Sequence, residues 1–580
     1  MANYVCSGAQ LKCAMGLAPS VLIVTHPAEP VFIENMNMAT IMDFLPVTNI
    51  QPFGMCRSPI NPAVIAATAA ALGTPTPAPC IPATGTPWVQ GETTKVMVKG
   101  KPALMNDAKL SCMWAPAGIE VATTGQSLGI AGTGAAAAPA VVIPPSPRCL
   151  VLFRPDDDYQ GEFGFDWLRD DIPNDNVFNM SYERTLRAAY LASGVELRDR
   201  FAYNVLKSNE YNLIWNPIKG SASSGSYLNL FPETLIETLS IYPEQPPLQS
   251  SATLQVYVEI NNEDVDEIKF EFDGNFISIN GGDAYSLPEK KQCSLQKSAN
   301  STIKITCKNV ISNDNQGKIE VWAYPKGSKA KPEEQQKKER KLVGLIKVGP
   351  NNDIKRLKIV LVKVLTNIDN ISEGERTGTF VDEEIKHVYL ALYQALIIPE
   401  IEHCGIMLDL SKNKDFQVSG KYVYTNKLNK LFIKNCFRSE LIHDLLKETR
   451  KIFLKDDRNK KYRSDWFTAF SFDNEASNEE GVLSGSAEEL GMWNIGLFRN
   501  DLDVVPFAVP WTLPHEILHS FGLFHTHDKG WPEAKYIYDL GPAATATDNV
   551  MSYNNVQRST WKWQWIIMRR HYRLTSNITK

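Results

Sequence analysis

The residues best suited to chemistry in this sequence lie close together, between positions 515 and 525. His515, Glu516 and His519 form an HExxH motif, which Gly522 and His525 extend to HExxHxxGxxH. On a helix, residues four apart share one face, so both imidazoles of the HExxH motif can reach a single ion while Glu516 projects beside them. Three neutral imidazoles with an open fourth position are typical of a catalytic zinc site.

The third ligand depends on how the chain turns after the helix. A glycine can adopt the left-handed conformation that ends a helix, so we expect Gly522 to bring His525 back to the ion. His527 and Asp528 are alternative third ligands, although the spacing favours His525. The alternative to a metal site is a pair of core histidines on a buried helix, but the five fixed positions coincide by chance only on the order of once in 100,000 chains of this length. We therefore expect one catalytic Zn²⁺, bound by His515, His519 and His525.

A second motif is centred on Met551, 26 residues after His525, in the sequence Asn549-Val-Met551-Ser-Tyr553. Together the two motifs resemble the metzincin metallopeptidases, and the Met-Ser-Tyr form is similar to the serralysin and astacin branches. The resemblance covers roughly residues 355–580 and implies that Met551 forms a hydrophobic floor beneath the zinc ligands. It also implies that Tyr553 is a ligand or an oxyanion-stabilising hydroxyl. The calcium-binding repeats of serralysins are not found in this sequence, so calcium binding is not implied.

Hydrolysis of peptide bonds is the reaction that these residues predict. Zinc lowers the pKa of its water to about 7, and Glu516 can accept that proton during attack on a carbonyl polarised by the same ion. Glu516 then delivers the proton to the leaving amine. Tyr553 would stabilise the oxyanion, a contribution of roughly 3 kcal/mol.

The elements that must position this site follow from the periodicity of residues 351–580. A buried strand is expected at residues 359–362 and further strands at 406–410, 466–472 and 492–498, with amphipathic helices at residues 385–396 and 441–452. Alternating strands and helices predict an α/β, metzincin-like zinc peptidase domain.

Length and composition predict further domains before this one. A chain of 580 residues that is 43 % hydrophobic and 22 % charged exceeds what one compact core supports, so about three or four domains are expected. With 60 basic and 65 acidic side chains the net charge is −5, which gives no basic field for nucleic acid. Residues 1–150 hold only 13 of the 125 charges, but 18 of the 35 prolines and 6 of the 10 cysteines. Two different kinds of protein are therefore joined.

Residues 1–127 consist of short apolar runs separated by Pro and Gly, with one expected helix at residues 61–72. Their Cys, Gly and Pro positions, in segments such as 5–13, 49–62, 79–88 and 110–126, resemble the PAAR-like spike-tip family of type VI secretion. The resemblance implies a small β-rich cone that docks on a trimeric spike and carries an effector behind it. The cysteines of this region are metal ligands, disulfides or buried packing residues. Because His26 is the single histidine among residues 1–150, a second ion in the tip is possible but unsupported.

Residues 128–149 form a Pro/Ala-rich linker, and residues 150–350 alternate with a period of two. We expect a β-rich spacer folded as an antiparallel, immunoglobulin-like sandwich. Asp273-Gly274 predicts a two-residue hairpin, and the charged run at residues 326–341 predicts a solvated hairpin tip. Pro147-Arg148-Cys149 also resembles the start of a cysteine-switch peptide that keeps some metzincins latent, although a linker thiol is the default.

These parts together predict a type VI secretion effector whose tip delivers a zinc endopeptidase toxin into a target cell. The first residues show no Sec-type signal and no membrane span is visible, so we expect synthesis in the cytoplasm and export through the contractile injection system. The expected partners are the trimeric spike, an immunity protein and a protein or peptide substrate, with no nucleic acid. The alternative function is a structural or receptor-binding tip with a secondary or inactive peptidase domain. The substrate and the target compartment do not follow from the sequence.

Overall fold

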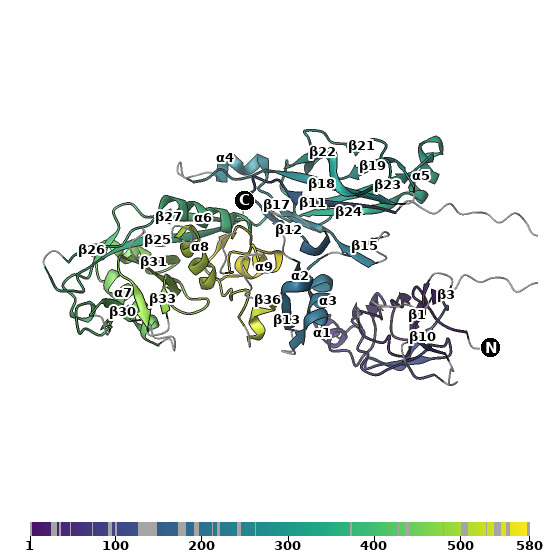
Figure 1. The fold of residues 1–580 in the computed structure, drawn as a ribbon, viewed down its shortest axis with the longest axis horizontal. Coiled ribbons are helices and arrows are strands. Elements are labelled where there is room, and N and C mark those ends of the chain that lie inside the picture. Colours follow the sequence, from purple (N-terminus) through teal and green to yellow (C-terminus); the bar gives the residue numbers. More distant parts are fainter. Residues whose placement is uncertain are drawn as a thin grey trace, which may run out of the picture. The chain divides into compact units, whose positions relative to one another are not determined.

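A computed structural model of the chain places most residues between 3 and 576 (Figure 1). It describes residues 3–576 apart from 25–31, 34–35, 47, 72, 91–95, 99–100, 126–147, 172–180, 191–195, 212, 217–220, 240–244, 262, 372–373, 427–428, 435–439, 479–480, 500–508, 529–530, 539–546 and 553–556. The chain divides into two compact units, residues 1–142 and 143–580. The described structure is multidomain and largely β-sheet, as composition and alternation predict.

The N-terminal unit is built from short strands. Four of them form an antiparallel sheet in the order β2-β1-β10-β9, with bounds Ser20–Val21, Gln10–Cys13, Ala115–Val121 and Lys109–Cys112. Three two-stranded pairs surround it: β3–β4 (Phe32–Ile33, Met36–Asn37), β5–β6 (Met55–Cys56, Ala78–Pro79) and β7–β8 (Met97–Val98, Lys101–Pro102). The expected helix is α1, Pro62–Ala70, which begins where the Asn61 side chain accepts a hydrogen bond from the backbone N–H of Ala63 and where a proline occupies the first turn.

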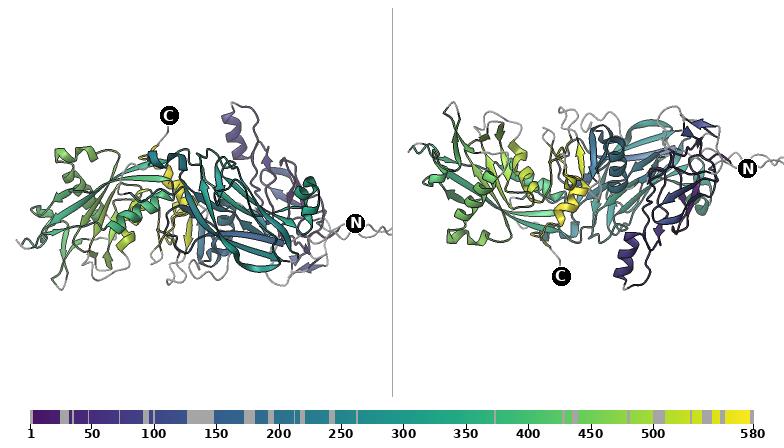
Figure 2. Two further views of the ribbon diagram at one scale, coloured as in Figure 1. Left: turned by 90° about the horizontal axis from the view of Figure 1, so that it is seen from above. Right: turned by 90° about the horizontal axis from the view of Figure 1, so that it is seen from below.

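The second unit begins with a two-layer β-sandwich, seen from two further sides in Figure 2. One sheet has the order β11-β18-β22-β20, with bounds Arg148–Pro155, Ser251–Asn261, Cys293–Cys307 and Ile277–Ile279. The other has the order β12-β17-β24-β23-β19-β21, with bounds Gly164–Asp166, Ser226–Asn229, Lys341–Val348, Lys318–Pro325, Val265–Glu271 and Tyr285–Leu287. All pairs are antiparallel except β17 with β24, which is parallel. Helix α5 (Glu333–Glu339) lies in the charged connection between β23 and β24, which confirms the expected hairpin tip.

The prediction of a two-residue hairpin at Asp273-Gly274 is wrong. The turn is present, since the backbone N–H groups of Phe276 and Ile277 donate to the Asp273 carbonyl. However, β19 before it pairs with β21 and β23, whereas β20 after it pairs with β22 in the opposite sheet. The turn therefore carries the chain from one layer of the sandwich to the other, a difference that local turn residues do not reveal.

The rest of the unit is organised on a mixed sheet in the order β26-β25-β31-β35-β34, with β27, β28 and β37 also paired to β25. The bounds of β25, β26, β27, β28, β31, β34, β35 and β37 are Lys355–Thr366, Arg376–Thr377, Ile397–Glu402, Met407–Asp409, Trp466–Phe472, Gly485–Ala487, Asn494–Phe498 and Thr575–Ser576. Strands β25, β31 and β35 are parallel, and β34 is an antiparallel edge strand. A smaller sheet, β29-β30-β32-β33, comprises Val423–Thr425, Leu431–Lys434, Ala476–Asn478 and Gly481–Leu483.

Helices cover both faces of the mixed sheet. Alternate residues of β25 point to opposite faces, and because both sets are apolar, each face packs against helices in a core of its own. One face, with Leu357, Ile359 and Leu361, shares a core with α6 (Asp382–Tyr393) and α8 (Val509–Ser520). The other, with Val360, Val362 and Val364, shares a core with α7 (Glu440–Phe453). This is the α/β arrangement that the periodicity predicts, and it buries the helix that carries the HExxH motif.

Elements on the two sides of the domain boundary expected at residue 350 pair and pack with one another. Strand β13 (Leu186–Tyr190) pairs with β14 (Glu196–Arg198) on one side and with β36 (Tyr536–Tyr538) on the other (Figure 1). Helices α2 (Tyr182–Thr185) and α3 (Asp199–Glu210) share an aromatic core with β36 and with residues next to α9 (Lys562–Arg569). The remaining elements are β15 (Leu213–Asn216), β16 (Ser221–Ser224) and α4 (Ile236–Leu239). None of the described helices is long and apolar enough to cross a membrane.

Candidate metal centre

The zinc-motif helix α8 is anchored at both ends. Near its start, Leu513 lies next to the buried Glu384 carboxylate of α6, which pairs with Arg499 at 2.6 Å. Burial nevertheless raises the pKa of Glu384. At its end, Gly522 has a φ of +86° and its N–H donates to the His519 carbonyl at 2.8 Å. The left-handed glycine ends the helix as its position suggests.

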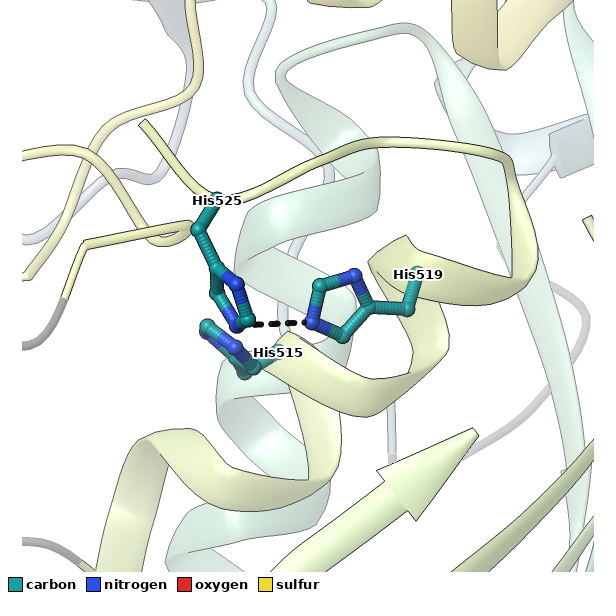
Figure 3. A group of neighbouring side chains, drawn as sticks. All are labelled: His515, His519 and His525. Carbon is teal, nitrogen blue, oxygen red and sulfur yellow. Dashed lines mark hydrogen bonds between the residues drawn. The ribbon is translucent and has the colours of Figure 1, made fainter. Parts of the chain in front are cut away.

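His515, His519 and His525 converge on one point (Figure 3). The first two project from α8 and the third from the loop that follows it. One ligand atom from each ring lies within 4.8 Å of the others, and the Nε2 atoms of His519 and His525 are 3.0 Å apart. Ligand bonds of about 2.0–2.1 Å would put tetrahedral nitrogens about 3.3 Å apart, so these rings fit one zinc ion closely.

Each Nδ1 atom of the three rings faces an oxygen. His515 Nδ1 lies 2.9 Å from the Val550 carbonyl, and His519 Nδ1 lies 2.7 Å from the Leu523 carbonyl. His525 Nδ1 lies 3.1 Å from both carboxylate oxygens of Asp528. These acceptors favour the proton on Nδ1, which gives each Nε2 a lone pair. Two such lone pairs 3.0 Å apart repel unless a cation lies between them, so the donor set suits a metal ion.

Burial favours the neutral form of the first two rings. It lowers the pKa of His515 to about 3, with a further contribution from nearby His525, and lowers the pKa of His519 well below its usual value. A metal ligand must be unprotonated, so these imidazoles are ready to bind an ion at neutral pH.

The two alternative third ligands take different places. Asp528 hydrogen-bonds the His525 ring and its backbone N–H, so it orients that ring from the side opposite Nε2. The pKa of Asp528 is lowered by the same contacts, against the effect of burial. His527 stacks on His525 with ring centroids 5.0 Å apart, and a second possible ligand group combines His525, His527 and Asp528.

Glu516 points to the edge strand β34. Its carboxyl is buried, and burial raises its pKa to about 8, partly offset by the nearby backbone N–H of Ala487. A Cβ atom added to Gly485 would lie 2.7 Å from Cγ and 2.8 Å from Oε1 of Glu516. The edge strand therefore approaches this carboxyl so closely that any larger residue at position 485 would displace the Glu516 side chain. No motif or spacing in the sequence pointed to this contact.

The second motif packs against the first. Met551 is fully buried in the core that includes Leu513 and Ile517 of α8, and its carbonyl accepts from the N–H of Thr526, next to His525. The turn at residues 549–551 therefore contacts both the helix ligand His515 and the loop of the third ligand. Tyr553, the expected oxyanion-stabilising residue, lies outside the described residues.

The cysteines of the N-terminal unit are buried (Cys6, Cys56 and Cys112) or partly buried (Cys13 and Cys80). No disulfide bond joins any of the described cysteines, and burial raises the pKa of Cys13 and Cys80. Among the described residues, the groups of three possible ligand atoms that lie within 4.8 Å consist of the histidines and Asp528 above. Cys149 is fully buried in β11 within the sandwich core, a place that argues against the cysteine-switch interpretation.

Comparison with known proteins addresses the N-terminal unit. A family model described as a domain of unknown function, DUF4280, matches residues 5–126. This family is associated with type VI secretion spike-tip proteins. No curated protein matches the chain. The match ends before the sandwich and the metal centre.

Proposed function

We propose that the chain is a type VI secretion effector in which a PAAR-like tip delivers a zinc-dependent endopeptidase of the metzincin type. The observation that carries the enzymatic part is the convergence of His515, His519 and His525, with every Nδ1 facing an oxygen acceptor. The family match at residues 5–126 supports the delivery part. The trimeric spike, an immunity protein and a protein or peptide substrate are the partners that this function requires.

His515, His519 and His525 would hold the ion through Nε2. Zinc, when bound, supplies a Lewis acid that polarises a carbonyl and acidifies water in its open position. Glu516 lies one residue after the first ligand, and its carboxyl lies near the Ala487 N–H of strand β34. In the proposed reaction this carboxyl, kept ionised by the positive charge of the bound ion, accepts a proton from the attacking water and passes it to the leaving amine.

The edge strand β34 lies directly beside the Glu516 carboxyl. Strand β34 pairs with β35 along one side, and its residues Gly485 and Ala487 contact Glu516. An extended peptide that lies along this edge would pass next to the proton-transferring group. This arrangement favours a polypeptide substrate over a small molecule. Tyr553 remains the proposed oxyanion-stabilising residue by resemblance.

The test compares full-length wild type with Glu516→Gln, and with Glu533→Gln as a control at an exposed carboxylate in the same region. Zinc content, cleavage of a peptide library and killing of neighbouring cells are measured for each. We expect Glu516→Gln to keep its zinc and lose at least about 100-fold in cleavage, since general acid–base catalysis contributes 10²–10⁴-fold. A Glu516→Gln protein that has lost cleavage but kills like wild type would support the alternative, a structural or receptor-binding tip, whereas undiminished cleavage would refute the role of Glu516.

A further inference from the structure

A buried arginine from the sandwich region lies next to the second motif. The Arg169 guanidinium contacts the Asp166 carboxylate at 2.9 Å and the Asp548 carboxylate at 3.3 Å. All three side chains are almost fully shielded from solvent, with at most 2 % of any of them exposed. The guanidinium also lies 3.5 Å from the centre of the Trp167 ring. One positive charge thus lies between two buried negative charges. Arg169 and Asp548, which form one of the two pairs, are 379 residues apart in the sequence.

Asp548 directly precedes the turn that supports the metal ligands. Its carbonyl accepts from the N–H groups of Arg558 and Ser559, so its backbone is fixed as well as its side chain. Two residues later, the Val550 carbonyl faces Nδ1 of His515 at 2.9 Å. The path from Arg169 to the first ligand therefore runs through one ion pair and one short turn.

The same region also supports the loop of the third ligand. Strand β13 pairs with β36, and the Tyr190 N–H donates to the Lys535 carbonyl. The Tyr538 N–H of β36 in turn donates to the Thr526 carbonyl at 2.6 Å, one residue after His525. Phe524, on the other side of His525, packs against the cluster of Ala188, Ala534 and Ile537.

We propose that Arg169 is a positioning residue of the metal centre, and that residues 166–171 and 181–190 belong to the catalytic unit instead of a passive spacer. The inference rests on the proposed function, because it concerns the geometry of the same three ligands. Arg169 acts through Asp548 on the turn at residues 549–551 and through that turn on His515. Strand β13 acts through β36 on the loop that holds His525.

Arginine suits this position better than lysine. Its planar fork reaches both carboxylates while its face stacks on Trp167, and an ammonium group cannot do both. Removal of the whole charge would leave two carboxylates buried without a partner, which is strongly destabilising. Conservative variants are therefore the informative ones: Arg169→Lys keeps the charge, and Asp548→Asn keeps the shape of the side chain.

A matched control is available in the sandwich. Arg340 pairs with Glu271 and lies 4.1 Å from the centre of the Trp322 ring, so it has the same kinds of partner as Arg169. Its carboxylate partner Glu271 and its ring partner Trp322 belong to strands β19 and β23 of the sandwich. Arg340→Lys therefore reports the general cost of such a change.

The experiment uses the full chain, loaded with Co²⁺ for its visible absorption and with Zn²⁺ for affinity by competition with a chelator. We expect Arg169→Lys and Asp548→Asn to bind Zn²⁺ at least about tenfold more weakly, as for other residues that orient metal ligands, and to alter the Co²⁺ spectrum. Arg340→Lys should match wild type in both. If Arg169→Lys does not fold, Asp548→Asn decides, since it leaves the Arg169–Asp166 pair intact.

Two results have different meanings. Unchanged Zn²⁺ affinity and Co²⁺ spectrum in the folded variants would overturn the role of Arg169 and leave the proposed function standing. Wild type that binds neither metal would overturn the proposed function itself.

Discussion

Substitution of Gly485 by Ala tests the position of Glu516 with a single methyl group. The added Cβ would lie 2.7 Å from Cγ of Glu516, whereas ordinary contact begins at 3.4 Å. The carboxyl must therefore move by at least about 0.7 Å, and misplacement on this scale costs roughly 100-fold in rate. The backbone at Gly485 is not in the left-handed region, so alanine brings no strain of its own.

Gly496→Ala is the matched control on the neighbouring strand. Gly496 pairs with Ser486 in the same sheet, and its added Cβ would lie 2.8 Å from Leu446 and 3.1 Å from Phe498, away from Glu516. We expect both variants to lose stability, by about 1–3 kcal/mol for an overpacked core, as measured by urea unfolding. Gly485→Ala alone should lose cleavage of the peptide library. Equal activity in the two variants would refute the close approach of the edge strand to a proton-transferring carboxyl.

Three further predictions concern stability. His387, which packs on Trp511 with ring centroids 4.2 Å apart, has its pKa lowered by burial. The unfolded chain then binds the proton more readily, so this group destabilises the fold as pH falls below about 6.5, and His387→Gln should reduce that loss in thermal unfolding between pH 5 and 7.5. Leu446→Ala should lower the free energy of unfolding in urea by about 2–5 kcal/mol, since Leu446 is fully buried beneath the sheet. A smaller loss would mean that neighbouring side chains fill the cavity left by the leucine. Residues 351–580 alone should unfold without cooperativity in circular dichroism, whereas 143–580 should unfold cooperatively; a cooperative short fragment would contradict the shared core of α2, α3 and β36.

The sequence predicted what is local. The spacing of His515, Glu516 and His519 specifies a helix face, and Gly522 marks the end of that helix, because both depend on a few neighbouring residues. The continuous apolar run at residues 359–362 likewise predicted a strand buried on both faces. The helices α6 and α7 follow from apolar residues at helical spacing.

The sequence did not predict contacts made by the backbone or between distant segments. The acceptors of His515 and His519 are the carbonyls of Val550 and Leu523, and any residue type could supply them. The approach of Gly485 to Glu516 depends on the order of strands in the sheet. The Arg169–Asp548 pair joins two segments that the periodicity assigned to separate domains, and the Asp273-Gly274 turn joins two sheets where local pattern predicts one.

The most direct test of the central claim is the metal content of the purified full-length chain, with anomalous diffraction at the zinc edge. The account predicts one zinc per chain, bonded to Nε2 of His515, His519 and His525, and none at that position in a His515→Ala, His519→Ala double variant. Wild type without zinc, or a double variant that retains the same ion, would contradict it.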